Sequence, residues 1–423
     1  MSWCLISREK RYSAMRDASP TPINYNSPRG DLESYHMIGR ITSKRAAIAF
    51  LIGFLAVNAL AVYYLWYKGP YCDGKCYVVN QSFDFQGGSY PRMAQAGDLL
   101  LVAYSDGCFV LDGINLTSGT TLGARVIIPY GIDAARNTLH YAEALNLVIC
   151  VYNHDAARSI GIAWAPRADV LNPLAWQRRD NLTGPVNQTF EDIGLWEPYL
   201  APYNDTTFLL YYSNQTIFDP AHPIDASGYY FLLKGYKVVQ KIDICRVQWN
   251  GTSFNARYCG AASHDIPGGP IHYKDGMASS VMVGGNETCK EYLMTFEQFK
   301  PPTYDINIAM VKLRVSDAGV HTLWRRDIPN SSGGAPFIAR IGDGTFVTSF
   351  RHFYPGDRTD RIAFVAMAAD QETFSQPTIL STGVFGWPSI FADAQGRLWL
   401  AGEKVNPWTV TVMQLSMDFN WHG

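Results

Sequence analysis

The chain has 423 residues, of which 47% are apolar, 13% aromatic and 17% charged, and its formal net charge is −2. Its 36 Gly and 23 Pro residues are close to average usage, which excludes collagen-like and low-complexity proteins. The small negative charge creates no global positive field for phosphates, so a nucleic-acid partner is not expected. Few charges and many aromatic residues favour an all-β chain.

Residues 46–66 are the first predicted element, a membrane-spanning helix. The segment AAIAFLIGFLAVNALAVYYLW has one strongly polar member, Asn58, and matches the length that crosses a bilayer core. Aromatic residues gather at its C-terminal end, as at a membrane interface. A buried core helix or a cleaved signal peptide is the alternative, but a signal peptide would lie nearer the N-terminus and precede a cleavage site.

The charge distribution predicts the orientation of this helix. Residues 1–45 hold eight Lys or Arg and four Asp or Glu, so the positive-inside rule places them in the cytosol. We therefore expect a single-pass type II membrane protein: a disordered cytosolic tail (1–45), the anchor (46–66), a juxtamembrane stem (67–82) and one large domain (83–423). The large domain would lie outside the cell or in the lumen of the secretory pathway.

Glycosylation sequons and cysteines point to the same compartment. Seven of the eight cysteines follow the anchor, and an oxidising compartment permits disulfides there. Cys72 with Cys76, and Cys245 with Cys259, are the candidate pairs, and the odd count leaves at least one thiol free or intermolecular. All nine N-x-Ser/Thr sequons also follow the anchor, which predicts N-glycans at Asn80, Asn115, Asn181, Asn187, Asn204, Asn214, Asn250, Asn286 and Asn330.

A composite pattern recurs six times after the anchor. Each copy has a Pro or small residue, a short strand, a polar turn, and an apolar strand that ends in a polar residue. Repeats of about 50 residues built from short antiparallel strands are typical of propeller blades, and each hairpin would be the inner pair of strands of a blade. We predict a six-bladed β-propeller, with an ordinary β-sandwich as the alternative. The copies are 90–106, 138–155, 197–214, 275–297, 335–352 and 387–403.

The starts of the innermost strands surround the central channel of a propeller, so they are candidate positions for a binding site. Residues that end the second strand, such as Asp106, Asn153, Glu297 and His352, are expected near the other rim or in loops. Tryptophans that could stack on sugars are Trp196, Trp387, Trp399 and Trp408. The predicted substrate-binding residues are Tyr90, Arg92, His140, Asp275, Arg351 and Trp387.

Two carboxylates are the candidate catalytic residues. Glu197, in DIGLWEPYL, and Glu297, in YLMTFEQF, lie among apolar residues, where an acid is costly without a function or a partner. Glycoside cleavage needs such a pair, one to protonate the leaving oxygen and one to attack or to activate water. The alternative is two structural carboxylates paired with Arg or with backbone N–H groups. Asp275 is a third candidate acid, although Asp-Gly is also common in turns.

Arg92 follows a Pro at a predicted strand start. Its guanidinium would bind hydroxyls or a carboxylate of a ligand, or would pair with an acid of the neighbouring blade. No zinc-protease, phosphate-loop or paired CxxC motif is present, so neither a metal nor a cofactor is expected.

The ordered set YPRM, WEPYL, QKIDICRVQWNG, KDGMASSV with YLMTFE, GGAPFIARIGDGTFVTSF and GWPSIF resembles glycoside hydrolase family 93. Its members are exo-acting α-L-arabinanases of the sialidase-like six-bladed propeller superfamily. The resemblance covers most of residues 85–405 and implies a retaining mechanism in which Glu197 and Glu297 are the two glutamates. It does not say which is the nucleophile. The chain departs from the family pattern at Lys274, where Arg is usual, and in the insertion 217–240.

The predicted function is therefore a membrane-anchored retaining glycoside hydrolase that acts on arabinan or a related glycan. A non-catalytic propeller that binds glycans or proteins is the first alternative. A sialidase-like exo-glycosidase is the second, although no intact S-x-D-x-G-x-T-W box is present. The expected partners are a carbohydrate and, through residues 46–66, a membrane.

Overall fold

The computed structural model describes residues 77–105, 109–123, 126–128, 133–186, 193–217, 231–233, 235–262, 274–300, 305–342, 344–352, 361–404 and 409–419. These residues form 25 β-strands and three short 3-10 helices, η1 (Glu143–Leu145), η2 (Arg167–Asp169) and η3 (Pro173–Ala175). No helix in these ranges is long and apolar enough to cross a membrane. The predicted tail (1–45), the predicted anchor (46–66) and Cys72 with Cys76 lie outside the described residues.

Hydrogen bonding groups the strands into four sheets. The first contains β2 (Ser89–Ala96), β3 (Leu99–Ser105), β4 (Phe109–Asn115), β5 (Thr120–Thr121) and β6 (Val126–Ile128). The second contains β7 (Asp133–Ala142), β8 (Leu147–His154), β9 (Ser159–Pro166) and β10 (Gln177–Thr183).

The third sheet has twelve strands. Its first half contains β11 (Leu195–Pro202), β12 (Thr207–Ile217), β13 (Phe231–Leu233), β14 (Tyr236–Trp249), β15 (Phe254–Ala261) and β16 (Lys274–Gly285). Its second half contains β17 (Cys289–Lys300), β18 (Asp305–Ser316), β19 (Gly319–Arg340), β20 (Phe346–His352), β21 (Arg361–Met367) and β22 (Thr378–Ile379).

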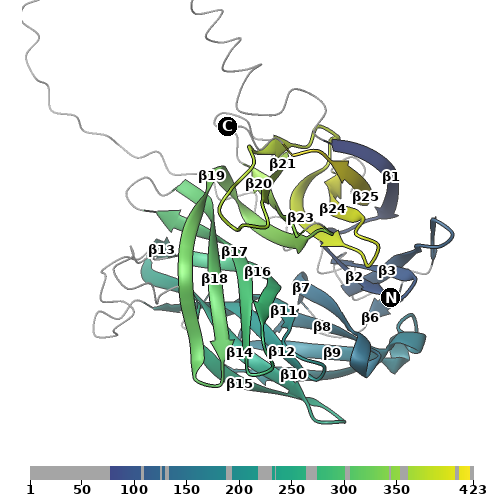
Figure 1. The fold of residues 1–423 in the computed structure, drawn as a ribbon. Helices are drawn as coiled ribbons and strands as arrows, with labels where there is room; N and C mark the ends of the chain where they lie inside the picture. The colour runs from purple at the N-terminus through teal and green to yellow at the C-terminus, as the bar shows by residue number, and fades with distance from the viewer. Residues whose placement is uncertain are drawn as a thin grey trace, which may run out of the picture. The chain divides into compact units, whose positions relative to one another are not determined.

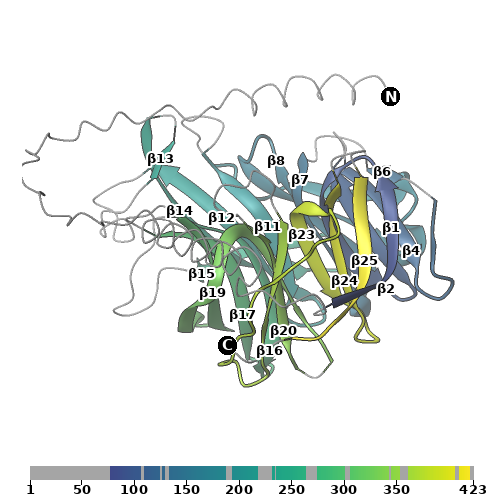
Figure 2. The ribbon, with the colours of Figure 1, turned by 90° about the horizontal axis from the view of Figure 1, so that it is seen from above.

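The fourth sheet joins the two ends of the described chain. It contains β23 (Phe385–Ala392), β24 (Leu398–Lys404), β25 (Thr409–Met417) and β1 (Tyr77–Gln86), with β1 antiparallel to β25 from Tyr77–Met417 to Gln86–Thr409. Figure 1 shows the dark N-terminal β1 beside the yellow C-terminal strands, and Figure 2 shows the same from above. Residues 77–82, expected to form part of the stem, are therefore the beginning of β1.

All six predicted hairpins are present as antiparallel strand pairs: β2–β3, β7–β8, β11–β12, β16–β17, β19–β20 and β23–β24. Their first strands contact one another in a closed cycle, in the order β2, β7, β11, β16, β19, β23 and back to β2. The prediction that these strands are the innermost ones is confirmed by this cycle. A central axis runs through the ring that they form.

Hydrogen bonding joins the strands into four sheets, whereas six separate blades would give six. One cause is the 22-residue strand β19, which pairs with β18 up to Ser332 and with β20 from Gly333 onward. The other is one parallel residue pair, Gln240 with Lys274, which links β14 to β16. These two links merge three of the hairpins into the twelve-stranded sheet.

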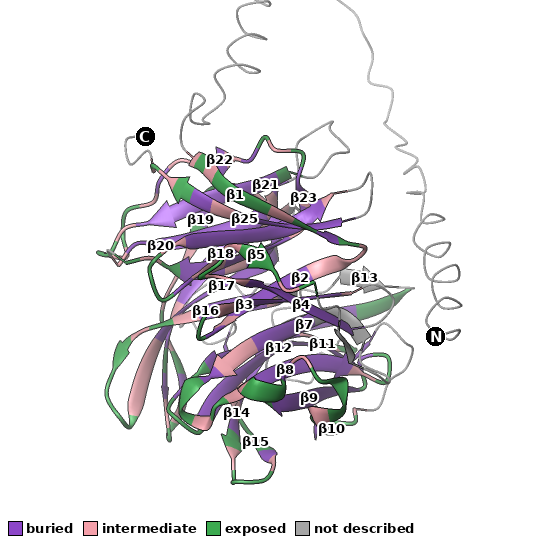
Figure 3. Cartoon of the chain, turned by 90° about the vertical axis from the view of Figure 1, so that its right-hand side faces the viewer, coloured by how far each residue is buried: buried purple, intermediate pink, exposed green. Residues whose placement is uncertain are grey.

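The hydrophobic core lies between neighbouring hairpins of the ring. One cluster joins Leu101 of β3 to Cys150 of β8, and the next joins Ile162 of β9 to Leu210 of β12. At the closure point, Val102 of β3 packs in one cluster with Val412 of β25. Figure 3 shows buried residues along the middle strands and exposed residues at many of the turns. Because both faces of these strands are covered, they read as continuous apolar runs such as LLLVAY.

The cysteines contradict one predicted pairing. Cys245 and Cys259 are both free thiols, as are Cys150 and Cys289, and no disulfide occurs among the described residues. A register shift after Ile244 places Tyr258, rather than Cys259, opposite Cys245. Cys245 then packs into the cluster that contains Val247, whereas Cys259 packs against the cluster that contains Tyr292. The two thiols lie in different clusters, so the predicted bridge does not form.

Candidate functional site

Each of the six inner strands carries a β-bulge near its start. The register of the hairpin shifts between Ser89 and Arg92, and the same occurs at the matching place in the other five. A residue with positive φ occupies this bulge in five strands, namely Tyr90, Glu197, Met277, Ala335 and Gly386. For a non-glycine residue this conformation costs about 1–3 kcal/mol and is typical of functional sites. A β-bulge bends its strand and changes the direction of the side chains beside it.

The backbone N–H of the bulged residue leaves the strand ladder and needs an acceptor. In four strands the acceptor is a polar side chain on the second strand of the preceding hairpin. The donor–acceptor pairs are Glu197 N to Asn153 Oδ1 (3.3 Å), Met277 N to Ser213 Oγ (3.2 Å), Ala335 N to Glu297 Oε2 (3.4 Å) and Tyr90 N to Glu403 Oε1 (2.8 Å). We call these four side chains the latch residues. All four lie in the C-terminal halves of the second strands. Asn153 and Glu297 were expected near the other rim or in loops, and the structure places them beside the bulges instead.

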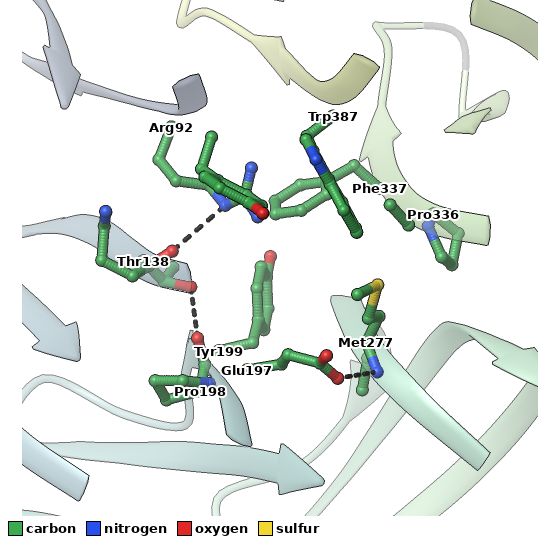
Figure 4. A pocket seen from close by; sticks show the side chains of 13 residues that line it. Arg92, Thr138, Glu197, Pro198, Tyr199, Met277, Pro336, Phe337 and Trp387 are labelled. Carbon is green, nitrogen blue, oxygen red and sulfur yellow. Dashed lines mark hydrogen bonds between the residues drawn. The ribbon is translucent and has the colours of Figure 1, made fainter. Parts of the chain in front are cut away.

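A pocket opens where the bulges meet, and all six inner strands line it (Figure 4). Four of the eight predicted site residues line this pocket: Tyr90, Arg92, Glu197 and Trp387. Sequence analysis did not identify the other lining residues, which are Asn137, Thr138, Pro198, Tyr199, Met277, Ala278, Ala335, Pro336 and Phe337.

One wall of the pocket is aromatic. The rings of Tyr90 and Trp387 lie 4.9 Å apart between centroids, and the guanidinium of Arg351 lies 5.1 Å from the Trp387 ring. On another side Tyr199 packs edge-on against Phe337 at 5.8 Å, and its hydroxyl donates to the Ser280 carbonyl at 2.9 Å. Burial raises the pKa of Tyr199 to about 12, so this hydroxyl stays protonated at neutral pH. Such flat apolar faces with polar edges suit the stacking of a sugar ring.

Arg92 is the cation of the pocket. It is 8% exposed, stacks over Phe337 at 4.3 Å, and donates through Nε to the Asn137 carbonyl and through Nη1 to the Pro91 carbonyl. Burial lowers its pKa to about 10, while the charge of Glu403 acts in the opposite direction, followed by Tyr90, Glu197 and Tyr199. The guanidinium is therefore held in a fixed orientation and remains charged at neutral pH.

Glu197 is the single carboxylate among the described residues that line the pocket. Its Oε2 accepts hydrogen bonds from Ser213 Oγ at 2.7 Å and from the backbone N–H of Met277 at 3.0 Å. Figure 4 shows the side chains of Glu197, Tyr199 and Arg92 turned toward the same space. A carboxylate that accepts two hydrogen bonds is set up as an acceptor, the state required of a nucleophile or a base.

The other predicted site residues are not in the pocket lining. Asp275 is fully buried and forms a bidentate ion pair with Arg325, with both oxygens at 3.2 Å. His140 is half-buried and packs edge-on against Phe208 at 5.5 Å. Glu297 is 6% exposed and serves as the latch of Ala335, and Arg351 reaches the site only through its contact with Trp387.

A signal for the missed residues was present in the sequence. Pro follows the bulged residue at Tyr90, Glu197 and Ala335, and it lies two residues after the bulge at Gly386. Pro has no backbone N–H and fixes its own φ, so it fits a position that leaves the strand ladder. Alignment of these prolines across the copies would have marked the bulges of four inner strands, and with them Tyr199 and Phe337.

His140 provides a prediction about pH. Burial lowers its pKa from 6.5 to about 4, so between these values the unfolded chain binds more protons than the folded one. The contribution of His140 to the free energy of unfolding is therefore fully present above about pH 6.5 and falls by on the order of 2 kcal/mol toward pH 4.

The measurement is urea unfolding of wild type and of His140→Phe at pH 7 and pH 4.5. Between these two pH values the free energy of unfolding should fall less in His140→Phe than in wild type. His352→Gln is the companion variant, since burial also lowers the pKa of His352, and an unchanged loss in His140→Phe would contradict this account.

With the site described, the chain can be compared with known proteins. No protein-family model matches it, and no curated protein sequence matches it. Among solved structures, an α-L-arabinanase of Penicillium chrysogenum complexed with arabinobiose superposes with a TM-score of 0.52 at 13% identity, over 81% of this chain and 98% of that one. The fold is a β-propeller. An endo-arabinase of Bacteroides thetaiotaomicron matches 70% of this chain and 99% of that one, at 13% identity and a TM-score of 0.42.

In a propeller the inner strands surround the axis, and the pocket of this chain lies at that axis. The site consists of one carboxylate, one buried guanidinium, and aromatic rings that come from different parts of the ring. Its polar groups are few and held by backbone contacts, which is the usual composition of a small-molecule site.

Proposed function

We propose that the chain is a carbohydrate-active propeller whose axial pocket binds a terminal sugar unit, and that it is a glycoside hydrolase with Glu197 as one catalytic carboxylate. The observation that carries this proposal is the position of Glu197 on a strained bulge beside the aromatic wall and Arg92. The arabinanase named above was solved with arabinobiose, which makes arabinan the first substrate to test. The resemblance to glycoside hydrolase family 93 points to the same substrate.

We assign Glu197 the role of nucleophile or base, because its Oε2 already accepts two hydrogen bonds. A retaining mechanism needs a second carboxyl group about 5–5.5 Å away. Glu297 is the partner that the sequence predicts. Its contact with Ala335 N favours a structural role instead, so its test is a comparison of activity and stability in the same variant. The experiment for the whole proposal measures hydrolysis of linear arabinan and of an aryl α-L-arabinofuranoside by wild type and by Glu197→Gln.

A non-catalytic glycan-binding propeller is the second candidate. It is favoured by the single carboxylate among the described lining residues of the pocket. Binding without cleavage would appear as a saturable calorimetric signal with an arabinan oligosaccharide that wild type leaves intact. A sialidase-like activity would instead require the substrate carboxylate to meet several arginines, and Arg92 is the single arginine in the described lining.

We further propose that the propeller has six blades. The six hydrophobic clusters, which lie between successive hairpins of the described chain, support this count. The twelve-stranded sheet would then be three blades, divided at Gln240–Lys274 and at Ser332–Gly333.

We also propose that residues 46–66 anchor the chain as a type II membrane protein with its glycans on the propeller side. The support is the apolar segment and the one-sided distribution of the sequons. Full-length chain made in eukaryotic cells should resist carbonate extraction and lose mass on treatment with a peptide N-glycosidase. An N-terminal tag should remain open to protease in intact microsomes. Release by carbonate, or a mass unchanged by the glycosidase, would contradict the proposal.

A further inference from the structure

Glu403 is a buried carboxylate that no sequence motif marked. It lies on β24, is 4% exposed, and is the latch of the first inner strand. Its Oε1 accepts the backbone N–H of Tyr90 at 2.8 Å, the shortest of the four latch contacts. A burial of this degree is costly for an acid unless the carboxylate is hydrogen-bonded and paired with a cation.

The negative charge of Glu403 raises the pKa of Arg92, against the lowering by burial. Glu403 leads the charges that favour the protonated guanidinium, ahead of Tyr90, Glu197 and Tyr199. The same carboxylate accepts the backbone N–H of Tyr90, which belongs to β2 as Arg92 does. Glu403 therefore affects two residues of the pocket wall.

The backbone around Glu403 is built to admit its carboxylate. Gly386 has a φ of +84°, and a Cβ at this position would lie 2.9 Å from Glu403 Oε2 and 3.0 Å from its Cδ. The next residue after Gly386 is Trp387, whose ring packs against Tyr90 at 4.9 Å. Glu403 therefore contacts the backbone of Tyr90 and lies beside Gly386, the residue that precedes Trp387.

Building on the proposed function, we propose that Glu403 is the positioning residue of the sugar-binding pocket, which holds the backbone of Tyr90 through its N–H and, beside Gly386, fixes Tyr90 and Trp387 as a stacking face. It acts through these residues and does not line the pocket itself. The other latch carboxylate, Glu297, contacts the backbone of Ala335 instead.

Two variants separate the hydrogen bond to Tyr90 from the negative charge that raises the pKa of Arg92. Glu403→Gln keeps an oxygen that can accept the Tyr90 N–H but removes the charge that supports Arg92. Because the pKa of Arg92 is about 10, its guanidinium stays charged at pH 7, so we expect an affinity for an arabinan oligosaccharide close to that of wild type at pH 7 and an alkaline loss of binding that begins at a lower pH. Glu403→Ala also removes the acceptor of the Tyr90 N–H, so we expect about tenfold weaker binding at pH 7 and a changed near-ultraviolet circular dichroism of the Tyr90–Trp387 pair in the free protein.

The control is Glu372→Gln, an exposed carboxylate that pairs with Arg326 and should match wild type in every readout. A wild-type affinity for the oligosaccharide in folded Glu403→Ala would overturn the inference. If wild type binds no sugar, the proposed function fails, and the inference is then decided by the free protein alone. In that case an unchanged aromatic dichroism in folded Glu403→Ala would overturn it.

Discussion

Replacing Glu197 by Gln is expected to lower the hydrolysis of an aryl α-L-arabinofuranoside by at least about 10³-fold. Gln has the same shape and can accept the Met277 N–H, but it is neither a nucleophile nor a base. The bulge at residue 197 should survive, because the Asn153 side chain accepts the backbone N–H of residue 197, which the substitution keeps. Initial rates with a chromogenic substrate, together with a thermal unfolding curve, check both parts of this expectation.

Glu297→Gln sharpens the interpretation of that result. Its carboxylate accepts the Ala335 N–H as a latch, and Gln keeps an oxygen for this contact, so we expect the substitution to leave most of the activity and of the stability. A loss of hydrolysis equal to that of Glu197→Gln, with unfolding unchanged, would instead support the two-glutamate mechanism that the sequence predicts. Full activity in Glu197→Gln would remove Glu197 from the mechanism altogether.

Replacing Arg325 by Met is expected to destabilise the chain by about 3–5 kcal/mol, because it leaves the fully buried Asp275 without its cation. Arg325 also donates to Gln298 at 2.6 Å and stacks over Phe296 at 4.8 Å, so the ion pair is part of a larger buried network. The free energy of unfolding in urea measures the loss.

Arg314→Met is the matched control for this prediction. Arg314 also pairs with a carboxylate, Glu291, at 2.7 Å, but about half of its side chain is exposed. Surface pairs of this kind contribute about 0–1 kcal/mol. The double variant Asp275→Asn with Arg325→Met should recover part of the loss, since no buried charge then lacks a partner. Equal losses for Arg314→Met and Arg325→Met would show that the buried pair has no special weight.

The repeats in the sequence predicted the hairpins correctly because a hairpin is local. Apolar runs such as LLLVAY and LVICVY, each preceded by a turn, define the second strands without knowledge of the rest of the chain. The division into sheets is not local in this sense. It depends on one pair, Gln240 with Lys274, and on a strand that continues through Ser332 and Gly333.

The site was predicted in part, for a similar reason. Residues at the starts of the repeats, such as Arg92 and Glu197, reach the axis because topology alone places them there. Asp275 also opens a repeat, but the bulge that follows Gly276 aims Met277 at the pocket and leaves Asp275 facing Arg325. The direction of this side chain depends on the positive φ of Met277, and no proline follows Met277 to mark the bulge in the sequence.

The central claim is that the axial pocket beside Glu197 holds a terminal sugar, and a crystal structure of Glu197→Gln soaked with an arabinan oligosaccharide tests it most directly. The account predicts a terminal sugar unit stacked on the Tyr90–Trp387 wall, with its reacting carbon beside residue 197 and a hydroxyl on Arg92. A sugar bound at another place on the propeller, with the axial pocket empty, would contradict it.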